Sequence, residues 1–346
     1  MAGRRGKGRK RKHSGAAGAI LVVLLLGLLA AAGAAWLVLA PYGPETETFV
    51  EIKPGSSAVA IGQQLEAAGI VRNQFAFDLL RWAKRGKLLA GEYRFDHPAS
   101  AIEVYARIRR GDVYTVSLTV PEGANIFDIA TRVESAGLGT RKDFLNAVTE
   151  ETGLVADLDP GAKTLEGYLF PDTYRFARNM KPAQIAAAMV RRFRVVADQL
   201  GLKGDVHRVV TIASLVERET ALDEERPLIA SVFENRLQKN MPLMTDPTVI
   251  YGLEREGRWR GALYQSDLTR NTAYNTYLHP GLPPGPISNP GTPSLQAAMN
   301  PAKTDYLYFV AASADAQGHS MFESTLDEHN RDVAAYRKAM KKAGLR

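Results

Sequence analysis

The sequence contains no cysteine, which excludes disulfide bonds and thiol catalysis. It also lacks an HExxH motif and any cysteine cluster that could complete a metal site with its histidines. We therefore interpret His319 and His329 as hydrogen-bonded structural histidines, and we expect neither a metal nor a cofactor. The missing cysteines do not by themselves assign a compartment.

A basic surface is also lacking beyond the first residues. The net charge of +7 comes from 44 basic and 37 acidic residues. Seven of the basic residues precede the first acidic one: Arg4, Arg5, Lys7, Arg9, Lys10, Arg11 and Lys12. The rest of the chain is neutral, with 44 − 7 = 37 basic residues against 37 acidic ones. This balance argues against nucleic acid as a partner.

The longest uncharged stretch runs from Ala16 to Ala40 and is densely apolar. Because a bilayer core needs about 20 apolar residues, we predict a single transmembrane anchor at 16–40. The basic tail at 1–15 is expected in the cytoplasm, which places the chain after Pro41 in the periplasm or its equivalent. The alternative is a signal peptide cleaved near Ala40.

The outward part is predicted to be α+β, with a small module at 41–112 and a larger domain at 113–346. A strand from Phe49, a Pro54-Gly55 turn and a helix at 57–69 recur as a strand at 116–120, a turn at Glu122-Gly123 and a helix ending at Gly137. Between them we expect a helix at 73–89, a strand at 91–95 and a helix at 102–110. Two such units suggest a duplicated element.

The larger domain is predicted to contain helices at 142–152, 181–200, 207–222 and 226–239. The segment 245–252 is expected to be a loop that exposes Asp246 before a proline. The proline-rich segment 281–293 is expected to be a rigid loop forming the wall of a site. A hairpin across Ala314–Gly318 and a helix capped by Thr325 and Glu328 should close the chain.

The helix at 207–222 carries the first candidate for chemistry. At 3.6 residues per turn, Val206, Val210 and Ala213 point within about 40° of Glu217. A carboxyl group buried without a cationic partner keeps its proton near neutral pH, as a general acid must. Glu217 is thus a candidate acid, although a glutamate in a core helix can equally form a salt bridge.

The segment 164–176 is rich in aromatic residues and contains Glu166 and Asp172. We expect an irregular segment lining a cavity, because aromatic rings beside carboxylates suit sugar recognition. Ordinary core packing is the competing interpretation, and this segment alone favours it.

Six blocks in order resemble the endolytic murein transglycosylase family of YceG-like proteins. They are LEGYLFPDTY at 165–174, ASLVERET at 213–220, TDPTVIYG at 245–252, AYNTY at 273–277, GLPPGPI at 281–287 and PAKTDYLYFV at 301–310. The resemblance implies a periplasmic enzyme with a small LysM-like module before its catalytic domain. It implies cleavage inside nascent peptidoglycan glycan strands, which sets where new strands end.

The resemblance also implies roles for particular residues. The first glutamate of the ASLVERET block is the catalytic one in this family, and here it is Glu217. Glu166, Asp246, Tyr274 and Asn275 are weaker candidates for holding acetamido sugars or orienting Glu217. Met244 departs from the polar residue typical of the family, which weakens the case for a sugar contact at 244 but not the case for Glu217.

The expected reaction cleaves the β-1,4 bond between N-acetylmuramic acid and N-acetylglucosamine and leaves a 1,6-anhydro ring. The substrate's own C6 hydroxyl is the nucleophile, so one carboxyl group can act as acid and then as base. A hydrolytic muramidase, with Glu166 or Asp246 as second carboxylate, is one alternative. A non-catalytic peptidoglycan-binding scaffold near wall synthases is the other.

Overall fold

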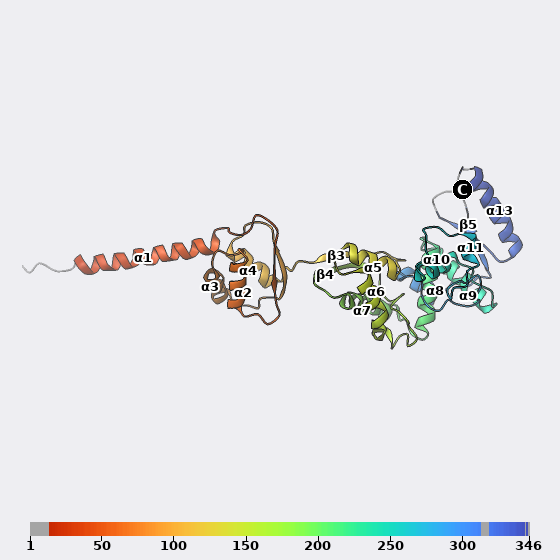
Figure 1. Ribbon diagram of the computed structural model, residues 1–346, viewed down its shortest axis with the longest axis horizontal. Coiled ribbons are helices and arrows are strands. Elements are labelled where there is room, and N and C mark those ends of the chain that lie inside the picture. The colour runs from red at the N-terminus through yellow and green to blue at the C-terminus, as the bar shows by residue number, and fades with distance from the viewer. Residues whose placement is uncertain (1–13, 313–317, 343, 345–346) are drawn as a thin grey trace, which may run out of the picture. The chain divides into compact units, whose positions relative to one another are not determined.

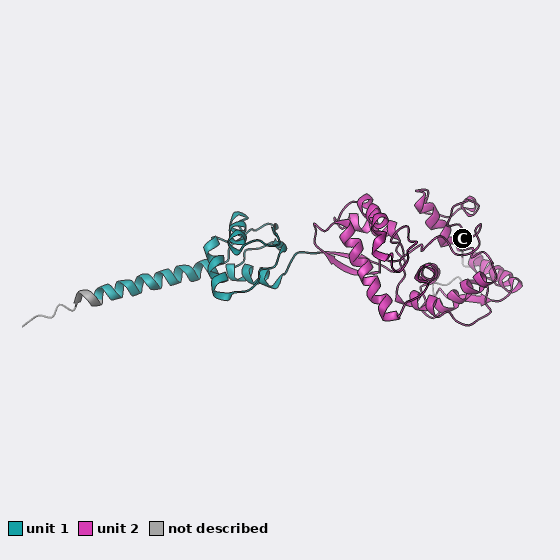
Figure 2. Cartoon of the chain, turned by 90° about the horizontal axis from the view of Figure 1, so that it is seen from below, with its two compact units in different colours: residues 1–115 teal, residues 116–346 magenta. Residues whose placement is uncertain are grey.

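The computed structural model describes residues 14–312, 318–342 and 344 (Figure 1). The chain divides into two compact units, Met1–Thr115 and Val116–Arg346 (Figure 2). The prediction of a mixed α+β fold is confirmed. Of the predicted basic tail at 1–15, residues 1–13 lie outside the described residues, and a helix begins at Ser14.

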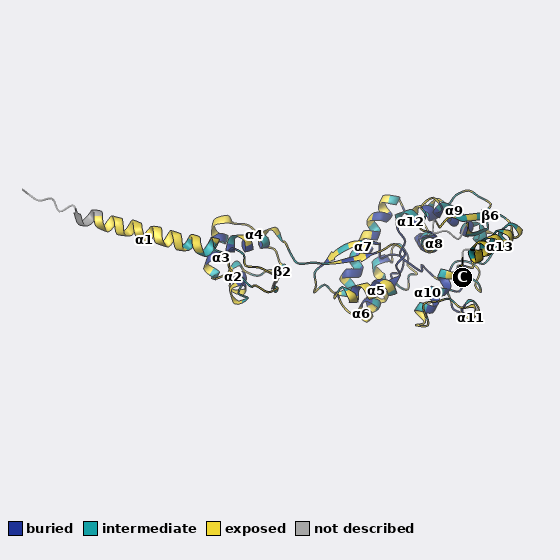
Figure 3. Cartoon of the chain, turned by 90° about the horizontal axis from the view of Figure 1, so that it is seen from above, coloured by how far each residue is buried: buried dark blue, intermediate teal, exposed yellow. Residues whose placement is uncertain are grey.

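Helix α1, Ser14–Leu39, opens the described chain. Its 22-residue stretch Gly18–Leu39 is long and apolar enough to cross a membrane. At 1.5 Å per residue this stretch rises about 33 Å, which matches a hydrocarbon core of about 30 Å. Figure 3 shows that most of α1 is exposed, because few of the described residues cover it.

The rest of the first unit packs three helices against a two-stranded sheet (Figure 1). Its elements are β1 (Thr48–Ile52), α2 (Ala58–Ala67), α3 (Gln74–Lys84), β2 (Gly91–Phe95) and α4 (Ala101–Arg110). Strands β1 and β2 are antiparallel, with Val50 opposite Tyr93. Alternate strand residues point inward and form one core with the helices.

The second unit is mainly helical around a separate core. Its elements are β3 (Val116–Val120), α5 (Ile126–Ser135), α6 (Arg141–Glu150), a 3-10 turn (Glu151–Val155), β4 (Asp172–Phe176), α7 (Pro182–Leu200), α8 (Val206–Glu219), α9 (Arg226–Gln238), α10 (Asp246–Arg255), α11 (Gln265–Leu268), α12 (Thr292–Met299), β5 (Tyr308–Ala311), β6 (Ser320–Glu323) and α13 (Leu326–Lys342). Helix α8 packs against α9, α10 and α12, so its middle is surrounded by other elements.

The predicted recurrence of a strand, a turn and a helix is confirmed in β1–α2 and β3–α5. Both helices begin with a side-chain cap, Ser57 in α2 and Asn125 in α5. Both are followed by a left-handed glycine, Gly69 and Gly137. The same local signals thus produce the same local structure twice.

The prediction of a loop at 245–252 is wrong, because α10 begins at Asp246. Pro247 lies in the first helical turn, where a backbone N–H has no helical acceptor to lose. Asp246 in that first turn also interacts favourably with the positive end of the helix dipole. The proline therefore starts a helix here rather than preventing one.

The segment 164–176 is irregular only in its first part. Its end is the strand β4, which pairs antiparallel with β3, Tyr174 lying opposite Leu118. Tyr168 and Phe170 are buried in the core, which supports the competing interpretation of core packing for those rings.

The end of the chain follows its local signals. Strands β5 and β6 form the predicted antiparallel pair, with Phe309 opposite Phe322. Most of the predicted turn at 314–318 lies outside the described residues. Thr325 and Glu328 form the expected capping box, with each side chain bonded to the other's backbone N–H.

Candidate active site

Glu217 lies in the last turn of α8, at the end of the predicted apolar stripe. Val206, Val210 and Ala213 are all buried in the core of the second unit, as the periodicity predicts. The Glu217 side chain is only 5% exposed. The stripe therefore brings a carboxyl group to the edge of the core.

The expectation that Glu217 has no cationic partner is wrong. Its Oε1 accepts a hydrogen bond from Arg226 Nη2 at 3.3 Å, and its Oε2 accepts one from the Gly291 N–H at 2.9 Å. The guanidinium of Arg226 is equally buried and also bonds Ser294 Oγ and Asp223. Because Arg226 belongs to the next helix, periodicity within α8 could not reveal it. Glu217 is thus held by a cation on one oxygen and by a backbone N–H on the other.

A second carboxyl group, Glu122, reaches the same place from the turn after β3. A methyl group built on Gly291 would lie only 1.9 Å from Glu122 Oε1, so this carboxyl group rests directly against Gly291. Burial and the charge of Glu217 raise the pKa of Glu122. The sequence analysis treated Glu122 only as part of a turn. In the sequence, Glu122 is marked only by its place in a turn that follows a strand, as Pro54 is in the first unit. That position does not indicate a chemical role.

The strap 287–291, part of the proline-rich segment, holds Gly291 beside Glu217. Ser214 of α8 fastens its first half, because Ser214 Oγ accepts from the Ile287 N–H at 3.0 Å and the Ser214 carbonyl accepts from Ser288 Oγ at 3.1 Å. Small residues on this face of α8 let the strap lie close to the helix. The wall predicted for this segment lies elsewhere, where Pro284, Gly285 and Pro286 line a cavity.

Asn289, in the same strap, connects three segments through buried hydrogen bonds. Its Oδ1 accepts from the Leu169 N–H at 2.8 Å, and its Nδ2 donates to the Ala124 carbonyl and to Glu166 Oε1, each at 2.9 Å. Its backbone pairs with the turn that carries Glu122, since the Gly123 N–H donates to the Asn289 carbonyl at 3.0 Å. The sequence analysis did not single out Asn289.

Glu166 is therefore part of a buried network. Its Oε2 accepts from the Ile126 N–H at 3.0 Å at the start of α5. Burial raises the pKa of Glu166 to about 8, so the group is largely protonated at neutral pH. The strap links Glu166 to Glu217 through Asn289 and Gly291, which are two residues apart.

Glu166 and Tyr274 line one cavity of about 270 Å³. The Tyr274 ring lies edge-on against Tyr251 at 4.9 Å, with the Arg255 guanidinium 5.3 Å from its centre. Asp159 enters the same cavity and pairs with His207 Nδ1 and with the Tyr168 hydroxyl, each at 2.8 Å. Two of the predicted sugar-binding candidates thus share a cavity.

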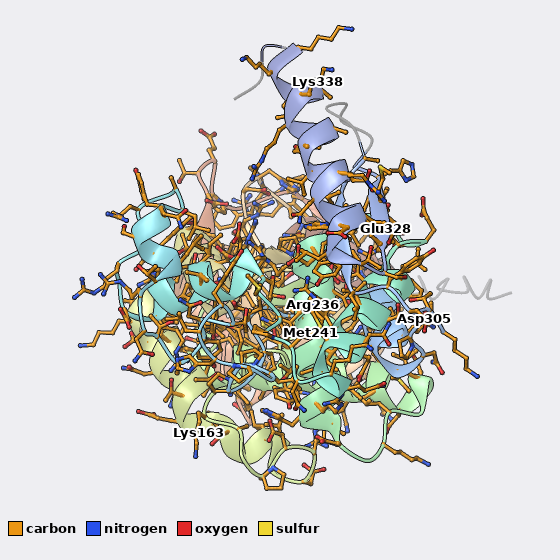
Figure 4. The ribbon with its side chains drawn as sticks, turned by 90° about the vertical axis from the view of Figure 1, so that its right-hand side faces the viewer. Lys163, Arg236, Met241, Asp305, Glu328 and Lys338 are labelled. Carbon is orange, nitrogen blue, oxygen red and sulfur yellow. The ribbon has the colours of Figure 1, made fainter. Side chains whose placement is uncertain are left out.

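Asp246 lines a different cavity of about 600 Å³ with Glu219, Arg236 and Tyr277. The Tyr277 hydroxyl donates to Asp246 Oδ1 at 2.7 Å, and Thr245 Oγ1 donates to Glu219. Burial raises the pKa of Glu219, so this cavity also contains a carboxyl group with a raised pKa. Figure 4 places Lys163, of the smaller cavity, well away from Arg236 and Met241 of the larger one. Glu217 is absent from the lining of both.

Asn275 is completely buried. Its Nδ2 donates to the carbonyls of Leu268 and Arg270, and its Oδ1 accepts from the Tyr277 N–H. These contacts fix the loop that carries Tyr274 and Tyr277. The geometry gives Asn275 a positioning role within this loop.

The two histidines considered above each lie beside a glutamate. His329 Nδ1 is 3.2 Å from Glu323 Oε2, and His319 Nδ1 is 3.5 Å from Glu225 Oε1. Within the described ranges, three or more histidine or carboxylate side chains do not gather in a way that could hold a metal ion.

Comparisons with known proteins place the chain in a family. The chain is 34% identical over 313 residues to the endolytic murein transglycosylase of Bacillus subtilis (strain 168), covering 84% of this chain and 85% of that one. It is 31% identical over 323 residues to that of Streptococcus pneumoniae (strain ATCC BAA-255 / R6), covering 83% of this chain but 58% of the relative.

A solved structure shares the fold. The crystal structure of a YceG-like protein from Listeria monocytogenes matches with a TM-score of 0.54 and 32% identity, covering 83% of this chain and 99% of that one. The model of the YceG-like family matches residues 50–335. The resemblance found in the sequence is thereby confirmed, and the chain belongs to the YceG-like family.

Proposed function

We propose that this protein is an endolytic murein transglycosylase, a lyase that cuts peptidoglycan glycan strands internally. The observation that carries the proposal is the intact Glu217 block in a chain aligned over most of its length with relatives of that name. The buried carboxyl group of Glu217, with Glu122 beside it at Gly291, gives this function a site.

The reaction needs a proton at the glycosidic oxygen between N-acetylmuramic acid and N-acetylglucosamine as the C1–O bond breaks. It then needs a base for the muramic acid C6 hydroxyl, whose oxygen closes onto C1. The proton lost in the first step returns in the second, and no water is consumed. The site must therefore hold one exchangeable proton near a carboxylate.

The Glu217 and Glu122 pair meets this requirement. Glu217 is held in place by Arg226 and the Gly291 N–H, and burial and the charge of Glu217 raise the pKa of Glu122. We infer that the two carboxyl groups act together and that Glu217 is the catalytic one. This extends the single-glutamate mechanism expected from the sequence.

The sugar contacts are also proposals. Tyr274 and Glu166 are candidates from the smaller cavity, and Asp246 is a candidate from the larger one, where Tyr277 and Tyr308 supply rings for pyranose faces. Asn275 is proposed to act by holding the loop that carries Tyr274 and Tyr277.

A hydrolytic muramidase is the competing enzyme. The expected second carboxylates do not contact Glu217: Glu166 bonds Asn289 and Ile126, and Asp246 bonds Tyr277. Product masses distinguish the two reactions. Anhydro-muramic acid ends support the lytic reaction, whereas reducing ends, heavier by one water, refute it.

A non-catalytic scaffold is the competing function from another class. We expect Glu217→Gln in the full-length protein to lower the rate of glycan cleavage by about 10²-fold or more, the usual contribution of an acid–base group. Glu234→Gln, which removes a carboxylate from α9 outside this cluster, is the control. Equal cleavage by parent and Glu217→Gln contradicts the enzyme assignment of this site.

The cellular setting follows from α1. We propose a single-pass anchor in the cytoplasmic membrane, with the N-terminus in the cytoplasm, a LysM-like module at 41–112 and a catalytic domain at 113–346 outside. Nascent glycan strands are the substrate, and peptidoglycan synthases are the proposed neighbours. A protease that cannot cross the membrane tests the orientation, because it should digest the outward domain in spheroplasts and spare the N-terminus.

A further inference from the structure

Helix α3 has two apolar faces, and the first unit covers only one of them. Ala76, Phe77 and Leu80 are buried in the module's core. Phe75, Leu79 and Trp82 are 68%, 45% and 77% exposed. At 100° per residue these three lie within about 60° of one another and form one stripe. Large apolar residues exposed in a continuous stripe mark an interaction surface.

The place of α3 beside the end of α1 indicates what this surface meets. Leu37 and Val38, in the last turn of α1, pack against the core of the module. The guanidinium of Arg72, two residues before α3, lies 4.4 Å from the ring of Trp36 and 4.7 Å from that of Tyr42. These contacts hold the start of α3 where the apolar helix ends.

Charge around the stripe matches a lipid surface. Arg81 and Lys84 occupy the last turn of α3, and Arg85 and Lys87 follow directly. Among the residues the structure describes, these four form no ion pair. The acid within the helix, Asp78, is turned toward Gly62 of α2. Apolar rings with adjacent basic residues are the composition of helices that lie in a membrane interface.

We propose that the Phe75, Leu79 and Trp82 face of α3 inserts into the interfacial layer of the membrane that α1 crosses, with Arg81, Lys84, Arg85 and Lys87 on anionic headgroups. The module would then be held to the membrane at two places, by α1 and by α3. This proposal rests on the membrane anchoring proposed above.

Tryptophan fluorescence of the full-length protein in nanodiscs tests this surface directly. The chain has 3 tryptophans, so a variant with Trp36→Phe and Trp259→Phe leaves Trp82 as the reporter. In phosphatidylcholine and phosphatidylglycerol nanodiscs we expect blue-shifted Trp82 emission that falls when the acyl chains are brominated. Water-like emission that bromination does not change overturns the proposal, and leaves a protein partner as the occupant of the stripe.

A second reporter separates failure of this surface from failure of the anchor. The variant with Trp82→Phe and Trp259→Phe retains Trp36, near the end of α1. Quenching of Trp36 without quenching of Trp82 refutes insertion of α3 while the anchor stands. Absence of quenching for both reporters refutes the anchor and, with it, this proposal.

The headgroup contact has its own test. Because the chain has no cysteine, Leu79→Cys can carry an environment-sensitive dye, with Val59→Cys on the 51% exposed Val59 of α2 as the matched control. We expect the dye at position 79 alone to shift to the blue, more strongly with phosphatidylglycerol than with phosphatidylcholine alone. Adding Arg81→Gln and Lys84→Gln should remove the difference between the lipids, and its persistence contradicts the proposed headgroup contact.

Discussion

Glu122 and Glu217 meet at Gly291, and this meeting is the chemical centre of the proposed site. Each residue comes from a different segment: the turn after β3, the end of α8 and the strap before α12. The glycine leaves room for Glu122, which occupies the space that a side chain at 291 would fill. The backbone N–H of Gly291 also fixes one oxygen of Glu217.

Gly291→Ala tests whether the position of Glu122 matters for catalysis. Its methyl group would fall 1.9 Å from Glu122 Oε1 and displace the end of that flexible side chain, while the backbone angle of −76° suits alanine. We expect cleavage to fall about tenfold or more with little change in the melting temperature. Gly153→Ala, where the added methyl meets nothing within 4 Å, is the control. Unchanged cleavage by Gly291→Ala would argue against a role for Glu122.

Glu166 should make stability depend on pH. Its pKa is raised by burial to about 8 from an ordinary value of 4.5, so the folded state binds more protons than the unfolded state between these values. Stability should consequently fall as pH rises from 4.5 to about 8, and the lost part should not return above that range. Urea midpoints across this range should show a flatter profile for Glu166→Gln than for the parent. Parallel profiles would show that Glu166 ionises normally.

The strap 287–291 is the element that organises the proposed site in the second unit. It has no regular structure, yet Ser214 and Asn289 fix it to α8, to the turn after β3 and to the segment before β4. This explains why a proline-rich segment far along the chain can determine the environment of Glu217. The two cavities then lie in the same unit as this fixed centre.

Asn289→Ala tests the strap as a structural element. The change leaves the Leu169 N–H and Glu166 Oε1 without their side-chain partner in a buried place, at a cost of about 1–3 kcal/mol for each unsatisfied group. The Ala124 carbonyl keeps the backbone N–H of residue 289. We expect a lower denaturation midpoint together with reduced cleavage. Asn300→Ala, at an exposed asparagine after α12, should change neither. A midpoint unaffected by Asn289→Ala would mean that the strap is held by other contacts.

At the scale of the whole molecule, each compact unit has its own hydrophobic core. Phe77 belongs to the first core and contacts Tyr105, with ring centres 5.4 Å apart. Phe193 belongs to the second core and contacts Tyr168 at 5.2 Å. The two cores share no residue, so each unit can unfold by its own transition.

Thermal unfolding of the full-length protein should therefore show two transitions. Phe77→Ala should lower the midpoint of one transition and Phe193→Ala that of the other. Each change should reduce the free energy of unfolding of its unit by about 3–5 kcal/mol, as for a buried phenylalanine. Calorimetry of both variants in the same detergent checks this assignment. A single transition lowered by both substitutions would show that the units unfold together.

The sequence by itself determined the elements that rest on local physics: the apolar α1, the two strand–turn–helix units, the capping boxes and the stripe that ends at Glu217. It also carried the family resemblance, because six blocks of residues are readable without a fold. Only the tertiary structure decided that Arg226 faces Glu217, that Glu122 lies against Gly291 and that Asn289 holds the strap. It also decided that Asp246 starts a helix. These contacts join segments far apart in the chain, and periodicity describes a residue's neighbours only within its own element.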